Sequence, residues 1–196
     1  MMLESALVMD SILDMRQKGF TLAELLVTVA VGAMLLAIGV PSYTTFVQNA
    51  SQITAANELL ASMHLARDIA ITRNVRVTVC PSSDGTDCNP VSWTEGWIVF
   101  IDADGDRQAD AGEPIERDVG GLRARSVTSA QFRDFLIFRP SGRVMVNSVA
   151  ENTGELTFCD KRGAAHARVL MVDMSGRPRV SRKSADGDEP VCPDGV

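Results

Sequence analysis

Apolar residues are spread unevenly along this chain, and the first dense block is the most marked. Residues 20–40 read FTLAELLVTVAVGAMLLAIGV, with Glu24 as the one charged side chain. As a helix this stretch spans about 31 Å, enough to cross the hydrocarbon core of a bilayer. Arg16 and Lys18 precede it, which by the positive-inside rule places its N-terminal side in the cytoplasm. The pattern predicts a membrane-spanning helix.

Helical spacing continues beyond this block to about Asn74. Residues three, four and seven apart form one face of a helix. The expected face consists of Phe46, Ala50, Ile53, Leu60, Met63, Arg67 and Ala70. Pro41 lacks a donor N–H and is expected to bend the helix or loosen its preceding turn. We therefore predict one helix over residues 20–74, with its second half packed on a globular domain.

From Val75 onward the pattern changes to the alternation of β-strands, interrupted by turns rich in Gly, Ser, Asp and Pro. The expected strands are Val75–Cys80, Gly96–Ile101, Phe135–Phe138, Arg143–Val146, Glu155–Cys159, Arg168–Asp173 and Pro178–Ser181. Residues 75–196 thus form a small antiparallel β-domain. The predicted fold class is α+β, with a long N-terminal helix packed on this domain.

Composition adds limits to this architecture. The chain is 45% hydrophobic and 22% charged, as in globular proteins, and its net charge is −6. An acidic chain has no general attraction to nucleic acid or to anionic lipid. Any such binding must therefore come from a local basic patch.

All four cysteines follow the apolar block, at Cys80, Cys88, Cys159 and Cys192. Export beyond the membrane would place them in an oxidising compartment, where they are expected to pair. Four cysteines allow three connectivities, and the simplest is Cys80–Cys88 with Cys159–Cys192. The separations, 88 − 80 = 8 and 192 − 159 = 33, do not match the close pairs of a zinc site. No metal or cofactor is expected.

Glu24 is the feature that simpler targeting segments leave unexplained. A secretory signal peptide has a shorter apolar region and a small-residue cleavage site, which is missing here. A plain membrane anchor has no need of a carboxylate within its apolar helix, where a charge is costly and usually has a partner.

Residues 18–25, KGFTLAEL, resemble the type III signal of type IV pilins and of type II secretion pseudopilins. The resemblance implies that prepilin peptidase removes a leader, residues 1–19, by cutting between Gly19 and Phe20, and methylates Phe20. Glu24 becomes the fifth residue of the mature chain. Met15 is an alternative start, because residues 15–19 alone form a compact basic leader.

Cleavage creates a positive α-amino group on Phe20 close to the Glu24 carboxylate. Neutralising these charges within one subunit, or between neighbours, offsets the desolvation cost of both. Assembly into a filament is then favoured when a neighbour supplies the opposite charge.

Further motifs resemble the GspH/FimT group of minor pilins and pseudopilins. They are residues 79–82, 93–100, 158–163 and 175–179. The resemblance implies a minor pilin of a type IV pilus, with other pilins as partners. The alternative is a GspH-like pseudopilin of a type II secretion system that binds no DNA. Either protein would sit in the inner membrane with its N-terminus cytoplasmic and its β-domain periplasmic, and would join a pilus or pseudopilus after assembly.

The C-terminal region carries the densest basic cluster of the exported domain, Arg177, Arg179, Arg182 and Lys183. Alternation along a strand places Arg177 and Arg179 on the same face, and guanidinium groups suit phosphate. In the FimT-like group a Gly-Arg-x-Arg segment is associated with DNA capture, which implies double-stranded DNA as a partner. The competing interpretation is a solvated edge strand whose charges oppose aggregation.

Two remaining features bear on chemistry. Residues 102–113 carry acidic side chains at positions 1, 3, 5, 9 and 12 of an EF-hand-like loop, but Arg107 stands where glycine is required and a strand precedes the loop. We interpret it as an acidic turn rather than a calcium site. Neither His64 nor His166 lies in a hydrolase motif. An enzyme is not expected, and a membrane-anchored periplasmic enzyme remains the remote alternative.

Overall fold

The structure is a computed structural model that describes residues 19–122, 126–146 and 153–193. The chain divides into two compact units, Met1–Thr45 and Phe46–Val196. Helix α2, Leu22–Arg73, contributes its first part to one unit and its second part to the other. The predicted α+β fold is confirmed, since a long N-terminal helix carries an antiparallel β-rich domain with two disulfides.

The start and end of α2 have clear local causes. The Thr21 hydroxyl oxygen accepts a hydrogen bond from the backbone N–H of Glu24 at 3.2 Å, which caps the first turn. Pro41 lies inside the helix, and its carbonyl oxygen accepts bonds from the hydroxyls of Thr44 and Thr45 at 2.9 and 3.0 Å. The helix ends before Asn74, whose φ of 55° is left-handed and breaks the helical path.

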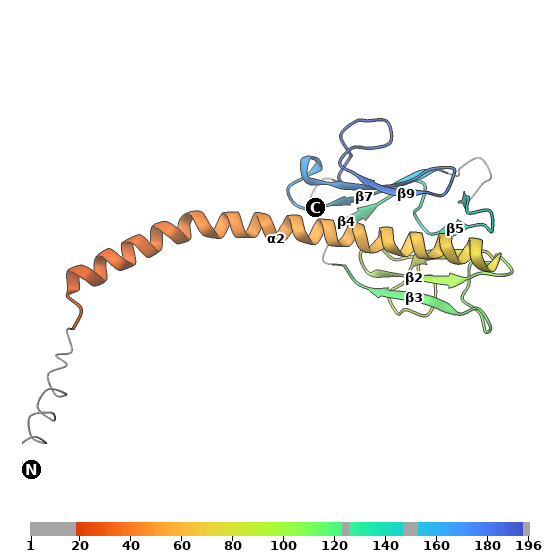
Figure 1. The fold of residues 1–196 in the computed structure, drawn as a ribbon, viewed down its shortest axis with the longest axis horizontal. Coiled ribbons are helices and arrows are strands. Elements are labelled where there is room, and N and C mark those ends of the chain that lie inside the picture. Colours follow the sequence, from red (N-terminus) through yellow and green to blue (C-terminus); the bar gives the residue numbers. More distant parts are fainter. Residues whose placement is uncertain (1–18, 123–125, 147–152, 194–196) are drawn as a thin grey trace, which may run out of the picture. The chain divides into compact units, whose positions relative to one another are not determined.

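Two antiparallel sheets make up the rest of the second unit (Figure 1). The first has the order β3-β2-β1-β5-β6 and the second β4-β7-β8-β9. The strands are β1 Val77–Pro81, β2 Gly96–Ile101, β3 Ile115–Gly120, β4 Ser126–Thr128, β5 Leu136–Phe138, β6 Val144–Met145, β7 Gly154–Cys159, β8 Arg168–Val172 and β9 Pro178–Ser181, with a 3-10 turn η1 at Ala164–His166. All seven predicted strands are present, and β3 and β4 are additional.

The second part of α2 runs across both sheets, and side chains from the helix and from each sheet join in one core (Figure 1). The helix supplies mostly small residues to this core, while the sheets supply large ones such as Trp97, Phe138 and Phe158. The buried helix positions are Gln52, Ala55, Ala56, Leu59, Ser62, Met63, Ala66, Ile69 and Ala70.

The helix face predicted from apolar spacing is wrong at its N-terminal end, where Phe46, Ala50 and Ile53 are exposed, and agrees with the structure from Leu60 onward, which packs against the core. Met63 and Ala70 are buried, but Phe46 and Ile53 are 68% and 43% exposed. Small residues let the helix axis come close to the sheets, where it meets side chains that are already large. Leu59, Met63 and Ile69 are the larger helix residues in this core.

Both tryptophans belong to this core. The Trp97 indole N–H donates to the Ser62 hydroxyl at 2.9 Å, and the Trp93 indole N–H donates to the Phe132 carbonyl at 2.8 Å. Trp93 is 2% exposed and Trp97 is fully buried. Neither indole is available for stacking on a nucleic-acid base.

The opposite face of the five-stranded sheet has a smaller core of Cys80, Ile98, Phe100, Phe135 and Ile137. The loop that carries Cys88 and the loop that carries Ala109 both pack against it. These two loops account for the burial of β2 on both of its faces.

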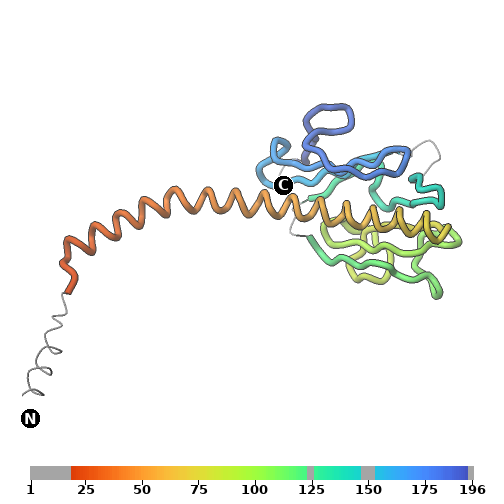
Figure 2. Tube along the Cα trace, in the orientation of Figure 1, coloured from red at the N-terminus to blue at the C-terminus, as the bar shows by residue number. Residues whose placement is uncertain are grey.

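Both predicted disulfides are present, with Cα–Cα distances of 5.5 Å for Cys80–Cys88 and 5.8 Å for Cys159–Cys192. The second joins β7 to the segment that leaves β9 and loops away from the four-stranded sheet, drawn in dark blue in Figure 2. The backbone N–H of Ala185 in this segment donates to a Glu155 carboxylate oxygen at 2.9 Å.

An ion pair next to this disulfide ties it to the helix. Arg162 contacts Asp160 at 2.6 Å and donates to the Asn49 side-chain oxygen of α2 at 2.8 Å. Burial would raise the pKa of Asp160, but hydrogen bonds from Arg162 outweigh it and lower that pKa to about 2. The pair therefore stays ionised at neutral pH.

Candidate functional site: the start of the helix and a C-terminal arginine surface

The predicted processing site lies at the start of α2. Gly19 and Phe20 precede the helix, the Phe20 side chain is 80% exposed, and Glu24 is an exposed acidic residue in the first turn. Glu24 follows Phe20 by about one helical turn, so a new α-amino group on Phe20 would lie near its carboxylate. Residues 1–18 of the predicted leader lie outside the described residues.

The first part of α2 is apolar and uncovered. It is the single helix, within the described residues, that is long and apolar enough to cross a membrane, and none of its most apolar stretch is buried. Large exposed side chains such as Leu26, Val29 and Leu36 follow one another along it. Hydrophobic area of this extent needs a bilayer or neighbouring helices to cover it.

Arg177 and Arg179 are both exposed and flank Pro178, which is buried. The turn before them is fixed by Asp173, whose carboxylate accepts bonds from the Ser175 hydroxyl and from the N–H groups of Ser175 and Arg177. The Ser175 hydroxyl is the main cause of a lowered pKa of Asp173, and the charge of Arg177 adds to it. Asp173 therefore remains negative beside the arginines.

Acidic groups also surround Arg179. It lines a pocket of about 380 Å³ together with Glu155, Asp173 and Asp186. Among the described residues, however, no carboxylate lies within 4.0 Å of the cationic atoms of Arg177 or Arg179. The two guanidinium groups thus keep free donors in a mixed electrostatic field.

Arg182 belongs to a different group of cations. The register of β8 and β9 pairs Val169 with Ser181, so Arg182 follows beside Arg168. Burial is the main cause of a lowered pKa of Arg168, and the charges of Arg182 and Arg162 lower it further. The structure therefore divides the basic cluster into an outer pair, Arg177 and Arg179, and Arg182 with Arg168. The sequence did not indicate Arg168 as a member of the basic cluster, because only the pairing of β8 with β9 places it beside Arg182. Lys183 is exposed beyond the end of β9.

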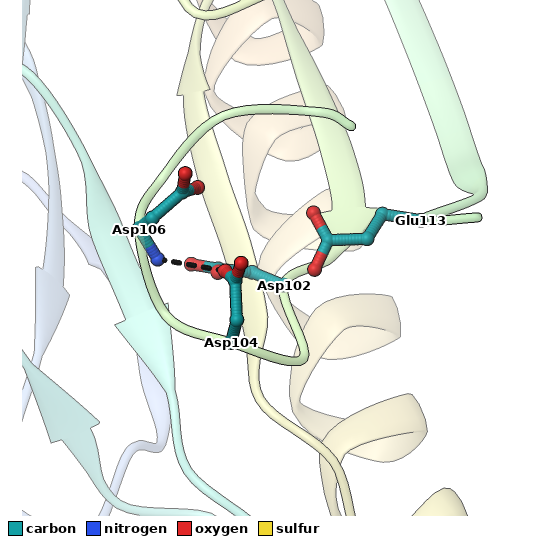
Figure 3. A group of neighbouring side chains, drawn as sticks. All are labelled: Asp102, Asp104, Asp106 and Glu113. Carbon is teal, nitrogen blue, oxygen red and sulfur yellow. Dashed lines mark hydrogen bonds between the residues drawn. The ribbon is translucent and has the colours of Figure 1, made fainter. Parts of the chain in front are cut away.

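The acidic loop after β2 brings four carboxylates together. Asp102, Asp104, Asp106 and Glu113 offer oxygen atoms that all lie within 4.8 Å of one another (Figure 3). The two histidines, His64 and His166, are exposed on separate elements.

Comparison with known proteins agrees with the geometry at the start of the helix. Residues 14–40 match the prokaryotic N-terminal methylation motif, and residues 55–176 match the type II transport protein GspH. The molecule is thus a pilin-like protein with a methylation motif ahead of an apolar helix. The chain belongs to the GspH family. The members of this family are structural pilins and pseudopilins and are not known enzymes.

A solved structure of a minor pilin shares this fold. The type IV minor pilin FimU of Pseudomonas aeruginosa, in a P21 crystal, is 22% identical with a TM-score of 0.51, over 69% of this chain and 92% of that chain. The same protein in a P65 crystal is 21% identical with a TM-score of 0.48, over 65% of this chain and 90% of that one. No curated protein sequence matches this chain significantly.

Proposed function

We propose that this protein is a minor pilin of a type IV pilus. In this proposal, prepilin peptidase removes residues 1–19, and residues 20–40 hold the subunit in the inner membrane with its N-terminus cytoplasmic. The domain of residues 75–196 then lies in the periplasm. The uncovered apolar helix, the methylation motif and the fold shared with FimU support the proposal.

Glu24 is the residue on which assembly depends in this proposal. In the membrane, its carboxylate and the α-amino group of Phe20 are both costly unless they are paired. A neighbouring subunit that supplies the missing partner lowers that cost, so the assembled state is favoured over a lone subunit. The exposed position of Glu24 in the first turn leaves its carboxylate accessible to such a neighbour.

We expect Glu24→Ala to lower incorporation into filaments at least tenfold while membrane insertion is unchanged, because an apolar replacement makes the span itself more favourable. Immunoblots of sheared filaments and of membrane fractions measure the two quantities. Asp68→Ala is the matched control, since Asp68 is also an exposed carboxylate on α2. Normal incorporation of Glu24→Ala would rule out charge pairing as the driving force.

The alternative is a pseudopilin of a type II secretion system, which the description of the matched family supports. The same filament preparations separate the two proposals. A minor pilin is recovered with sheared surface pili, and its deletion reduces piliation. A pseudopilin stays with the cell envelope, and its deletion reduces protein secretion instead.

Double-stranded DNA is the partner we propose for Arg177 and Arg179. Both guanidinium groups are exposed beside one another across buried Pro178, and they keep free donors that suit phosphate. Nearby carboxylates weaken the local field, and only a few phosphate contacts fit. Binding is therefore expected to be non-specific and weak, with a Kd on the order of 10⁻⁴–10⁻⁶ M.

We expect Arg177→Gln/Arg179→Gln to remove most DNA binding with little change in Tm, because both side chains are exposed. Fluorescence anisotropy of labelled duplex DNA across a salt series gives the affinity, with an expected log–log slope near −0.9 for each phosphate contact. Arg73→Gln/Arg76→Gln is the control, with the same charge change at two exposed arginines at and just after the end of α2. Equal losses in both double variants would point to net charge rather than to this surface.

A further inference from the structure

The loop between β2 and β3, residues 102–114, gathers more negative charge than an ordinary turn. Asp102, Asp104, Asp106 and Glu113 each place one carboxylate oxygen within 4.8 Å of all the others. Figure 3 shows the Asp102 and Asp104 side chains between Asp106 on one side and Glu113 on the other. Four like charges this close repel one another unless a cation or protons compensate them.

Asp102 provides independent evidence for a missing partner. It is fully buried, and one of its oxygens, Oδ2, accepts a hydrogen bond from the Thr78 hydroxyl. The other oxygen, Oδ1, is buried and has no hydrogen-bond partner among the described residues. Leaving a charged oxygen buried and unpaired is costly, and its neighbours in this cluster are acceptors too. A bound metal ion would be the positive partner that the Asp102 Oδ1 atom lacks.

We propose that this loop binds a calcium ion through Asp102, Asp104, Asp106 and Glu113. Calcium takes six to eight oxygen ligands at about 2.3–2.6 Å, so oxygens on opposite sides of one ion lie about 4.6–5.2 Å apart. The oxygen atoms of the cluster all lie within 4.8 Å of one another, close enough for one calcium ion to reach all four. Magnesium keeps several of its water ligands and is usually held by only one or two carboxylates, so a cluster of four carboxylates suits calcium better.

The backbone of the loop answers the first objection drawn from the sequence. Arg107 occupies the position where an EF-hand loop has glycine, yet its φ is 73°, in the left-handed region that such a position requires. Its guanidinium carbon lies 4.7 Å from the centre of the Phe135 ring, and this contact offsets part of the strain. An arginine here is thus compatible with a calcium loop.

The second objection was the strand in place of a helix before the loop. Strand β2 nevertheless holds Asp102, the first ligand, in a fixed position. Asp102 directly follows β2, its N–H donates to the Arg76 carbonyl at 3.0 Å, and Thr78 of β1 holds its carboxylate. The buried ligand is therefore fixed by two neighbouring strands before any ion binds.

Other contacts of the cluster leave room for an ion. The Ala103 N–H donates to Glu113, the Asp106 N–H donates to Asp104, and Gln108 donates to Asp106. Each carboxylate oxygen has two lone pairs, so an oxygen that accepts one bond can still bind a metal. Two arginines lie in or next to the loop: Arg76 donates to the Asp104 backbone carbonyl, and Arg107 stacks on the Phe135 ring. Among the described residues, neither forms an ion pair with one of the four carboxylates, so the cluster keeps a net negative charge.

Calcium is expected to raise the Tm of the purified, detergent-solubilised chain relative to the chelator EGTA. Extracellular modules bind calcium at about 10⁻⁴–10⁻³ M, so about 10 mM CaCl₂ corresponds to a Tm rise of about 3–10 °C. MgCl₂ at the same concentration, with NaCl matching the ionic strength, should give less than half of this rise. Calorimetric titration with CaCl₂ measures the Kd directly.

Two variants test which residues bind the ion. Asp104→Asn/Glu113→Gln should weaken calcium binding at least tenfold, and since both side chains lie outside the core, the fold without calcium should persist. Glu95→Gln/Asp134→Asn is the control, with the same loss of charge at two exposed carboxylates outside the loop.

Three results would overturn the site. The first is a Tm that does not change with CaCl₂, in which case a water molecule is the partner of Asp102. The second is an equal rise with MgCl₂ or NaCl, which is charge screening. The third is an equal loss of binding in the control variant. None of these measurements depends on whether the protein assembles into a pilus or a pseudopilus.

Discussion

A chain carrying Gly19→Ala should accumulate in the membrane as an uncut precursor. The proposed cut falls between Gly19 and Phe20, so a precursor keeps the leader and has no free amino group on Phe20. Glu24 then lacks its charge partner, and incorporation into filaments should fall below detection. Mass spectrometry of membrane-extracted protein distinguishes the precursor from a chain that begins at methylated Phe20.

Gly32→Ala provides a matched control for this experiment. It makes the same substitution inside the apolar helix, where an added Cβ meets nothing within 4 Å. Alanine is also the better helix former. Processing of Gly32→Ala should be normal. If Gly19→Ala were cut as efficiently as this control, the assignment of residues 1–19 as a leader would be wrong.

Removing the Cys159–Cys192 disulfide should destabilise the domain more than any surface change. A bond across 33 residues restricts the unfolded chain by about 4 kcal/mol in the loop-entropy description. For a domain of this size that loss lowers Tm by about 8–16 °C. The segment after β9 is then no longer tied covalently to β7, and the hydrogen bond from the Ala185 N–H to Glu155 is expected to weaken. Urea unfolding of Cys159→Ser/Cys192→Ser under non-reducing conditions measures the effect.

The Cys80–Cys88 disulfide is a built-in comparison, since it closes a much shorter loop, with a separation of 8 residues. Loop entropy then gives about 2.5 kcal/mol for Cys80→Ser/Cys88→Ser. A larger loss for the short loop than for the long one would show that packing of the loop against Ile98 and Phe100, rather than chain entropy, determines the stabilisation.

The strands with alternating apolar residues were predictable from sequence, and the two that lack this pattern were not. Strand β3 reads IERDVG and lies at the edge of its sheet, where its side chains are largely exposed. Its charges suit an edge strand but resemble a loop in sequence. Strand β4 has three residues, SVT, too few for a period to be visible. Pairing with β2 and with β7, rather than local sequence, creates these strands.

The helix itself was predictable, but the side that it buries was predictable only in part. Phe46 and Ile53 contribute strongly to the apolar pattern yet are exposed, whereas small residues such as Ala55, Ala66 and Ser62 are buried together with Leu59 and Met63. Close approach of helix and sheet selects small side chains on one partner when the other partner already supplies large ones. A single sequence does not reveal whether the helix or the sheets supply the large side chains that fill the core.

The candidate sites show the same division between local and long-range information. Residues Gly19, Phe20 and Glu24 follow from a contiguous motif at the start of the helix. By contrast, the neighbourhood of Arg168 and Arg182 depends on the register of β8 and β9. The importance of Asp102 depends on its burial beside Thr78, 24 residues away in sequence. Burial and strand register arise from the whole fold, so they are not written in any one segment.

The two buried tryptophans give the chain a selective optical reporter. The protein has no others, and both indoles lie in the core of the second unit, with Trp97 in contact with α2 through Ser62. Ultraviolet emission excited at the indole band therefore comes from this core alone. Separation of helix and sheets would hydrate Trp97 and shift its emission to the red, whereas events confined to residues 20–40, which contain no tryptophan, would leave the spectrum unchanged.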